Sequence, residues 1–479
     1  MCSSDLSVTN ARDMFYNCIS LKKIGNLNLT SLSGAGMQYM FAYCYNLLEI
    51  SGIQTTPNSL TNMTYTFLGC NKIKKIPFIN TQNVTNFRYT FQQCYELEYI
   101  GISYFSSGTD FTSVFQECWK LRYIGNEDGQ SDSGITLNLP NASNMTGAFF
   151  LCRSISNISL YVPKAYTWYR CFENTIINKV NIFNLGDESN VNFYQLFNGS
   201  SVRELNLQSS NSTVTFSGNY ALYYTFISCN NLRKLTANFS INYIGTNGSN
   251  FTNGTDSLIK WNIPIYHSSN QSSSWFSNCD SLREITGLTF APGTTITNNI
   301  FTGCRNLSKI EMEGYNVDLN LNNSNIGRTN MLNIFNVGLT AASGANVVNI
   351  YGTPADPYML DINDRSVVID KGYTFNSSML SSGLVMYLDG GKSGSYNGSG
   401  STWADIGGNT YPAASPNDGT ISGSTFNIDH FSFDGTNDVV TVGTDASLGF
   451  ADDFTIGVII EPLSLASGTQ SIIGRYETT

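Results

Sequence analysis

Charged residues and histidines are scarce in this sequence. Asp, Glu, Lys and Arg make up 13% of its 479 residues, against about 25% in an ordinary globular protein. The only histidines, His267 and His430, lie too far apart in the chain to suggest a Ser/Cys–His–Asp set. They also leave a zinc site almost without ligands, since no Cys-x-x-Cys pair occurs. Without a phosphate-binding Gly-x-x-x-x-Gly-Lys-Ser/Thr loop, the sequence favours a protein that has no active site.

Long apolar runs are also missing, and so is an excess of positive charge. No stretch approaches 18 apolar residues, so no membrane insertion is predicted. The segment Met1–Leu6 has neither the basic nor the apolar region of a signal peptide. A net charge of −10 argues against nucleic acid as a partner. The abundant Asn, Ser, Thr and Gly instead predict a surface of amides and hydroxyls, which is a common composition for extracellular fibres and adhesins.

Cysteine, by contrast, is plentiful and sits in one repeated slot. Ten of the 11 cysteines occupy the Cys position of an aromatic-x-x-Cys-x-x-Leu/Ile-x-x-Ile phrase. Nine copies are complete, at Cys18, Cys44, Cys70, Cys94, Cys118, Cys152, Cys229, Cys279 and Cys304. Three are degenerate: Trp168–Cys171 with an insertion after it, and Leu196–Gly199 and Phe251–Gly254 with glycine in the slot. The 24–26-residue spacing of uninterrupted copies predicts a solenoid whose coils bury their apolar faces against one another.

The equivalence of the cysteine slot in every coil argues against disulfides. We expect reduced, buried thiols that pack between ladders of phenylalanine and leucine. Glycine in two coils supports this interpretation, because a disulfide partner could not be lost so easily.

Each coil is expected to contain a tight turn and a short strand. The i, i+3, i+6 spacing of Phe, Cys and Leu predicts a helical turn. Alternating patterns at 100–102, 158–160 and 205–207 predict strands with alternate residues inward, stacked as a parallel sheet. The Gly/Ser/Asn-rich segments 125–134 and 209–218 are expected to be outer loops.

Four regions are predicted along the chain. Residues 1–328 form the solenoid, and 329–376 form a C-terminal capping unit with helices near 329–339 and 361–371 and strands near 346–351 and 373–375. Residues 377–383 form a linker. Residues 384–479 have the strand density of the first part of a β-sandwich, which the sequence leaves incomplete at Thr479. The predicted fold class is mainly β with short helical turns.

The repeated phrase over residues 15–310 resembles the BspA-like leucine-rich-repeat surface proteins. The end unit, with Asp361–Asp370 and Lys371-Gly-Tyr-Thr374, is similar to the element that follows such repeats in phage tail-associated proteins. The motifs Gly383–Asp389, Ser401–Asp405, Phe433–Val439 and Phe454–Val458 resemble the opening strands of a laminin-G/concanavalin A-like jelly roll. These resemblances imply a leucine-rich-repeat solenoid followed by a partial jelly roll, and recognition of glycans or proteins rather than catalysis.

Charge is concentrated at the two positions between the Leu and Ile anchors of each coil. Sixteen of these 24 positions are charged, and the four acids are Glu49, Glu98, Glu204 and Glu284. The row therefore carries +8 and the rest of the chain −18. The twelve basic residues are Lys22, Lys23, Lys74, Lys75, Arg122, Lys179, Arg203, Arg233, Lys234, Lys260, Arg283 and Lys309.

Two interpretations of this row remain open. The charges keep an exposed strand edge soluble, or they form a track for an anionic polysaccharide, teichoic acid or acidic protein. Tyr99, Tyr123 and Trp119 nearby could stack on sugars, which favours the second interpretation.

One cation site is suggested in the C-terminal region. Asp434, Asn437 and Asp438 could hold calcium through oxygen ligands, or form a polar hairpin whose side chains cap the backbone. No other cofactor is expected.

A phage structural protein would account for three features together: a composition typical of extracellular proteins, unpaired thiols and the absence of an export signal. We therefore expect a non-enzymatic virion fibre or tail-associated component, assembled in a reducing cytoplasm, that binds a host cell-surface glycan or protein. Further partners would be other virion proteins and a second copy of the chain. The alternatives are an extracellular bacterial surface adhesin, or a glycan-processing enzyme whose catalytic residues lie beyond Thr479.

Overall fold

The computed structural model forms two compact units. Unit 1 contains residues 1–359 and 367–377, and unit 2 contains 360–366 and 378–479. The structure describes residues 8–32, 36–56, 60–102, 104–125, 134–186, 190–217, 220–244, 251–268, 274–292, 294, 300–353, 360, 362–376, 401–403, 419–422, 424–427, 430–432 and 439–442.

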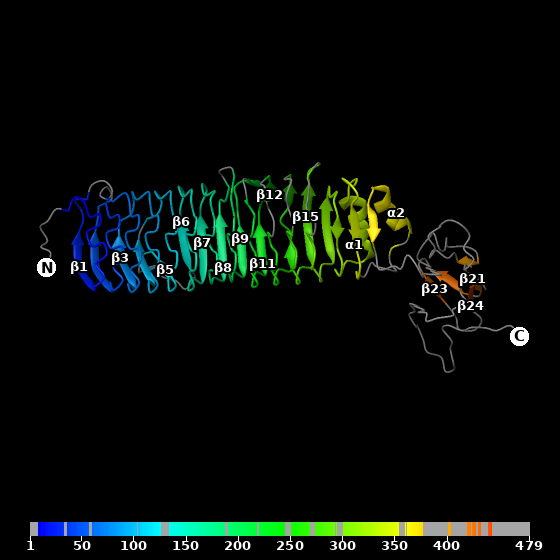
Figure 1. The fold of residues 1–479 in the computed structure, drawn as a ribbon, viewed down its shortest axis with the longest axis horizontal. Helices are drawn as coiled ribbons and strands as arrows, with labels where there is room; N and C mark the ends of the chain where they lie inside the picture. The colour runs from blue at the N-terminus through cyan, green and yellow to red at the C-terminus, as the bar shows by residue number, and fades with distance from the viewer. Residues whose placement is uncertain are drawn as a thin grey trace, which may run out of the picture. The chain divides into compact units, whose positions relative to one another are not determined.

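Unit 1 is a row of stacked coils, each of which contributes a short strand that lies beside those of its neighbours (Figure 1). The strands pair in parallel in the runs β1–β2, β3–β4–β5, β6–β7–β8–β9–β11 and β13–β15–β16. Their bounds are β1 Lys23–Asn28, β2 Glu49–Gln54, β3 Lys75–Ile79, β4 Tyr99–Ile102, β5 Tyr123–Ile124, β6 Ile135–Asn138, β7 Asn157–Tyr161, β8 Lys179–Phe183, β9 Glu204–Leu207, β11 Lys234–Ala237, β13 Lys260–Trp261, β15 Glu284–Phe290 and β16 Lys309–Glu313.

The alternation predicted for these strands is confirmed. In β7, Ile158 and Leu160 are buried while Asn157, Ser159 and Tyr161 are not. The register places the apolar anchors of neighbouring coils opposite one another, as with Ile24 and Ile50 or Ile158 and Val180. Apolar anchors one strand spacing apart, about 4.8 Å, form a continuous buried row, and this is why the 24–26-residue period builds a solenoid.

The Phe-x-x-Cys segments are not helical turns, contrary to the prediction. In the third coil the amides of Thr66, Leu68 and Cys70 bond three residues back, to carbonyls of their own coil. The alternate amides of Tyr65, Phe67 and Gly69 bond instead to the next coil, at 3.0, 2.8 and 2.8 Å. Half of the amides are thus used between coils, which a helix would not allow, and the i, i+3 spacing reflects a chain of turns.

Phenylalanine rings stack along the inside of these turns. The rings of Phe41, Phe67 and Phe91 lie 5.2 and 5.5 Å apart with interplanar angles of 11° and 7°. The same ladder continues through Phe115, Phe149, Phe172, Phe197 and Phe226. Offset-stacked rings at this separation add to their area burial, so the ladder fixes the spacing between coils.

The three coils between residues 204 and 267 carry a second strand each. β10 Thr213–Phe216, β12 Ser240–Tyr243 and β14 Ile265–His267 pair in parallel and join the second half of β15. Segment 209–218 was predicted to be an outer loop, and this is wrong for β10, because Val214 and Phe216 are buried. Gly/Ser/Asn-rich flanks concealed the short alternating pattern.

The end unit continues the parallel stack through β17 Leu319–Asn320, β18 Val347–Asn349 and β19 Thr374–Asn376. The predicted helices are present as α1 Arg328–Asn333, the π-helix η2 Ile334–Gly338, and α2 Ile362–Asp370. Lys371 donates from Nζ to the carbonyls of Phe335 and Leu339 at 2.6 Å and of Asn336 at 3.1 Å. A lysine at the C-terminal end of a helix satisfies carbonyls that have no partner within the helix.

The described part of unit 2 contains antiparallel strands. β20 Thr402–Trp403, β21 Gly419–Ser422 and β24 Val439–Val442 form one sheet, and β22 Thr425–Asn427 pairs with β23 His430–Ser432. The predicted linker 377–383, and most of the motifs that suggested a jelly roll, lie outside the described residues. The jelly roll therefore stays a prediction. Among the helices described, none is long and apolar enough to cross a membrane.

Candidate functional site

The cysteine slot is a ladder of thiol hydrogen bonds between coils. Cys44, Cys70 and Cys94 each donate from Sγ to the carbonyl of the phenylalanine of the preceding coil, at 3.0–3.1 Å. All ten cysteines of the described residues are free, and nine are buried. Cys18 is exposed, contrary to the prediction of a fully buried ladder, since it belongs to the first coil described. The thiols in the slot thus act as hydrogen-bond donors between coils, in addition to the apolar packing that we predicted.

Two degenerate copies keep this bond by using a hydroxyl. Thr175 donates to the carbonyl of Phe149 at 2.8 Å and Thr255 to that of Phe226 at 2.7 Å. The ladder of rings passes through Phe172 and Phe197 rather than Trp168 and Leu196. The predicted alignment of all three degenerate copies was therefore wrong, because the slot holds Thr175, Ser200 and Thr255 rather than Cys171, Gly199 and Gly254.

Burial controls the acidity of the thiols. It raises the pKa of Cys44 and of Cys279 to about 11, and raises that of Cys94 well above its ordinary value. Because the thiolate is the reactive form, these groups are inert at neutral pH.

Thiol titration of the native protein should show one fast-reacting cysteine among those described. We expect Cys18 to react with a disulfide reagent at pH 8 while Cys44 and Cys94 stay protected, in a Cys2→Ser background that removes the cysteine outside the described residues. All ten should react in denaturant, and Cys18→Ser is the matched control that should abolish the fast phase. Several fast-reacting thiols, or disulfides in the native protein, would contradict the buried ladder.

The predicted charged row consists of two parallel columns. The strand column contains the first residue of one strand in each coil, namely Lys23, Glu49, Lys75, Tyr99, Tyr123, Asn157, Lys179, Glu204, Lys234, Lys260, Glu284 and Lys309. The turn column lies one residue earlier and contains Lys22, Leu48, Lys74, Glu98, Arg122, Ser156, Asn178, Arg203, Arg233, Ile259, Arg283 and Ser308. Of the twelve predicted basic residues, eleven are exposed and Lys309 is partly exposed.

Four of the six lysines of the strand column are paired with its three glutamates. Lys23 pairs with Glu49 at 2.7 Å, Lys179 with Glu204 at 3.6 Å, and Glu284 with both Lys260 and Lys309 at 2.8 and 3.2 Å. The hydrogen bond from Lys260 lowers the pKa of Glu284. Opposite charges face each other because adjacent coils lie in register.

The basic residues of the turn column are different. Among the residues described by the structure, none of Lys22, Lys74, Arg122, Arg203, Arg233 and Arg283 takes part in an ion pair. Arg203 and Arg233 are direct neighbours, since the Arg233 amide donates to the Arg203 carbonyl at 3.0 Å. The turn column thus holds six basic residues and a single acid, Glu98, which lies between Lys74 and Arg122.

The aromatic residues near the row are partly occupied. Trp119 stacks on Tyr95 with ring centroids 4.2 Å apart, and the Arg153 guanidinium lies 5.2 Å from its centroid. The Tyr99 hydroxyl donates to the Gly125 carbonyl at 2.5 Å. These contacts reduce the ring surface that could stack on a sugar.

A more open aromatic surface lies on the outer face of β6, β7 and β8. Tyr161, which is 46% exposed, and Phe183 have ring centroids 5.9 Å apart. They border an open hollow of about 290 Å³ that is also lined by Thr136, Asn138 and Ser159. This surface could have been predicted from the sequence, because its residues occupy the outward positions of three consecutive strands.

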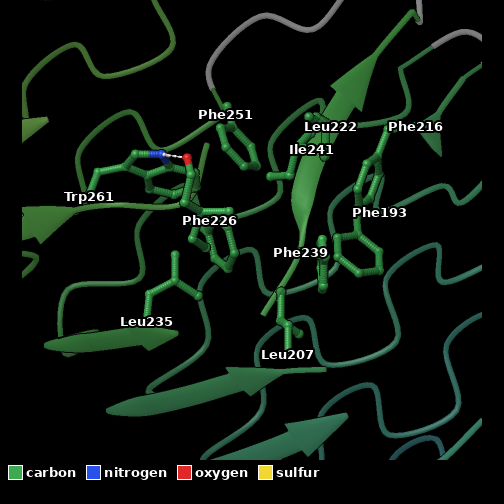
Figure 2. Close-up of a pocket in the computed structure, with 11 residues that line it drawn as sticks. Phe193, Leu207, Phe216, Leu222, Phe226, Leu235, Phe239, Ile241, Phe251 and Trp261 are labelled. Atoms are coloured by element: carbon green, nitrogen blue, oxygen red, sulfur yellow. Dashed lines mark hydrogen bonds between the residues drawn. The ribbon is translucent and has the colours of Figure 1, made fainter. Parts of the chain in front are cut away.

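An interior hollow in the second-strand region is too small for a ligand. Figure 2 shows it surrounded by apolar side chains, among them Phe193, Phe226 and Ile241, with Trp261 donating its indole N–H to Ile263 at 2.8 Å. Its volume of about 10 Å³ is about that of a single water, and the apolar lining offers a water no partner.

Metal sites receive no support from the described residues. They contain no group of three His, Cys, Asp or Glu side chains arranged to hold a metal ion. Asp434, Asn437 and Asp438 lie outside the described residues, so calcium there stays a prediction.

Sequence reasoning missed a third repeated position, an Asn or Asp five residues before the ring of the coil. Asn62, Asn86 and Asp110 each accept, at 2.8–3.0 Å, the backbone N–H two residues further on. Such Asx turns direct the chain into the turn segment, and the spacing to the phenylalanine was a signal that could have been found.

Unit 1 is thus a parallel solenoid made from one repeated coil. The family model described as the BspA-type leucine-rich repeat region matches residues 11–129 and 193–324 in 6 copies, together more than half of the chain. The chain belongs to the BspA-type leucine-rich repeat family. A leucine-rich repeat protein from Bacteroides ovatus ATCC 8483 is similar at 18% identity, over 63% of this chain and 81% of that one, with a TM-score of 0.30. No curated protein matches the sequence.

Proposed function

We propose that this protein is a non-enzymatic recognition protein whose solenoid binds an anionic component of a cell surface. The observation that carries the proposal is the row of exposed basic residues repeated from Lys22 to Lys309 along a chain of net charge −10. Leucine-rich repeat proteins of the BspA type are generally surface and adhesion proteins, which agrees with this role. A rigid stack presents repeated charges at a constant spacing, which is suited to an extended ligand.

Within this role, we favour a virion fibre or tail-associated component of a phage that recognises a host cell-surface glycan or protein. The support is chemical: the ten cysteines described are free, as expected for assembly in a reducing cytoplasm. A bacterial surface adhesin is the second candidate, favoured by the family. Mass spectrometry of purified virions and of bacterial surface fractions would distinguish the two.

Charge reversal of four exposed residues should abolish adsorption to host cells without unfolding the protein. The changes are Lys74→Glu, Lys75→Glu, Arg233→Glu and Lys234→Glu, all at exposed positions. Adsorption of the wild type should also weaken with salt, because exposed charges are screened over about 8–10 Å at moderate ionic strength.

Circular dichroism and thermal unfolding of the quadruple variant provide the control for folding. Equal adsorption of the folded variant and the wild type would overturn the proposal that the row binds the cell. Recognition would then belong to the outer loops or to unit 2, and the row would serve solubility.

A further inference from the structure

We propose that the ligand is a linear anionic polysaccharide and that the turn column, not the strand column, binds it, with Arg203, Arg233 and Arg283 as its principal contacts. This inference rests on the proposed function and assigns it to particular residues.

The first argument is the different charge balance of the two columns. Between residues 178 and 309 the turn column contains three arginines and no acid, whereas the strand column contains four lysines together with Glu204 and Glu284. Lys179, Lys260 and Lys309 are already paired within 3.6 Å. An incoming anion would have to compete with those glutamates, so the arginines offer more net attraction.

Nearby acids do not cancel the arginines. Asp256 and Asp280 are exposed two residues before the anchors Leu258 and Leu282, and Asp280 pairs with Arg305 at 4.0 Å. Neither forms an ion pair with Arg203, Arg233 or Arg283 among the described residues. The three guanidinium groups therefore remain available for an external anion.

The second argument is the residue type and its spacing. Arginine presents a planar fork of donors that matches carboxylate, sulfate or phosphate in a bidentate manner, while lysine does not. Arg203 and Arg233 lie on adjacent coils, about 5 Å apart along the stack, and Arg283 lies two coils beyond Arg233. A polymer with repeated anionic groups can bind several of these arginines at once, whereas a single small anion would bind one.

The third argument concerns hydroxyl groups. Two residues further along the strands, about 6.6 Å from the strand column, the outer face presents Ser159, Asn181, Asn206 and Thr236 in register. Asn181 donates to Ser159 and Thr236 to Asn206, both at 3.0 Å, and each amide keeps further donor or acceptor capacity. With the hollow beside Tyr161 and Phe183 on the same face, this surface suits sugar hydroxyls and sugar ring faces better than an acidic peptide.

Two triple variants of equal charge separate the columns. The test variant carries Arg203→Gln, Arg233→Gln and Arg283→Gln, and its matched control carries Lys179→Gln, Lys260→Gln and Lys309→Gln. Binding of the full chain to polygalacturonate and to dextran sulfate is measured by calorimetry, with neutral dextran, polyglutamate and single-stranded DNA as comparison polymers. We expect at least a tenfold loss for the arginine variant and less than threefold for the lysine variant, with both melting like the wild type.

The outcomes are distinguishable. Equal losses in the two variants, or a larger loss in the lysine variant, would overturn the assignment to the turn column while leaving polyanion binding in place. Tighter binding of the wild type to polyglutamate or DNA than to both anionic polysaccharides would overturn the ligand class. A wild type that adsorbs to cells but binds none of the polyanions would overturn the anionic track itself, and adhesion would have to be located elsewhere.

Discussion

Cys94→Asp is expected to lower the free energy of unfolding by at least about 4 kcal/mol, the cost typical of an unpaired buried charge. Cys94 is fully buried, and its Sγ donates to the Phe67 carbonyl at 3.1 Å. A carboxylate at this position would place an acceptor against an acceptor in surroundings that already disfavour the charged thiolate. Because each coil is stabilised through its neighbours, the damage should extend beyond the mutated coil.

Cys94→Thr is the matched control, since threonine makes the corresponding bond at Thr175 and Thr255. We expect it to cost less than about 1.5 kcal/mol, in the range of volume-conserving core changes. Both are measured by denaturant unfolding followed by circular dichroism. The buried donor ladder would be contradicted if the free energies of unfolding of Cys94→Asp and Cys94→Thr differed by less than about 1 kcal/mol, the size of an ordinary mutational effect.

The parts of the fold that repeat could be predicted from the sequence. The anchors Ile50 of β2, Ile158 of β7 and Leu205 of β9 lie inward as their alternation required, since a strand can bury only every second residue. α1 with η2, and α2, were visible because their apolar spacing departs from that of the coils.

The parts that depend on contacts between coils were predicted less accurately. Placing Cys171 in the slot was natural from spacing alone, yet only the stacked rings of Phe149 and Phe172, 5.3 Å apart, reveal the true alignment. The turns at Phe67 were mistaken for a helix because amide bonds to the next coil leave no trace in local spacing. Likewise, a total of +8 over the charged row concealed that Lys23 and Glu49 neutralise each other across β1 and β2.

Acidification is expected to destabilise the wild type through His267 by about 3 kcal/mol between pH 6.5 and pH 4, at about 1.4 kcal/mol per pKa unit. His267 is 1% exposed and lies among Tyr243, Trp275 and Phe290, with ring centroids 5.3, 4.8 and 5.8 Å away. Within the described residues neither ring nitrogen has a hydrogen-bond partner. Burial lowers the pKa of His267 from 6.5 to about 4, so the imidazole is neutral in the folded protein above about pH 4.

The direction of the effect follows from proton linkage. Between about pH 6.5 and pH 4 the unfolded chain takes up the proton while the folded chain does not, so stability falls as the pH falls. His267→Phe places another ring among the aromatic neighbours and removes this titration. Acidic groups elsewhere titrate in both proteins, so the difference between the two unfolding curves isolates His267. A wild type and variant whose stabilities fall in parallel from pH 7 to pH 4 would show that the imidazole is protonated in the folded state, and hence that the strand end at β14 admits water.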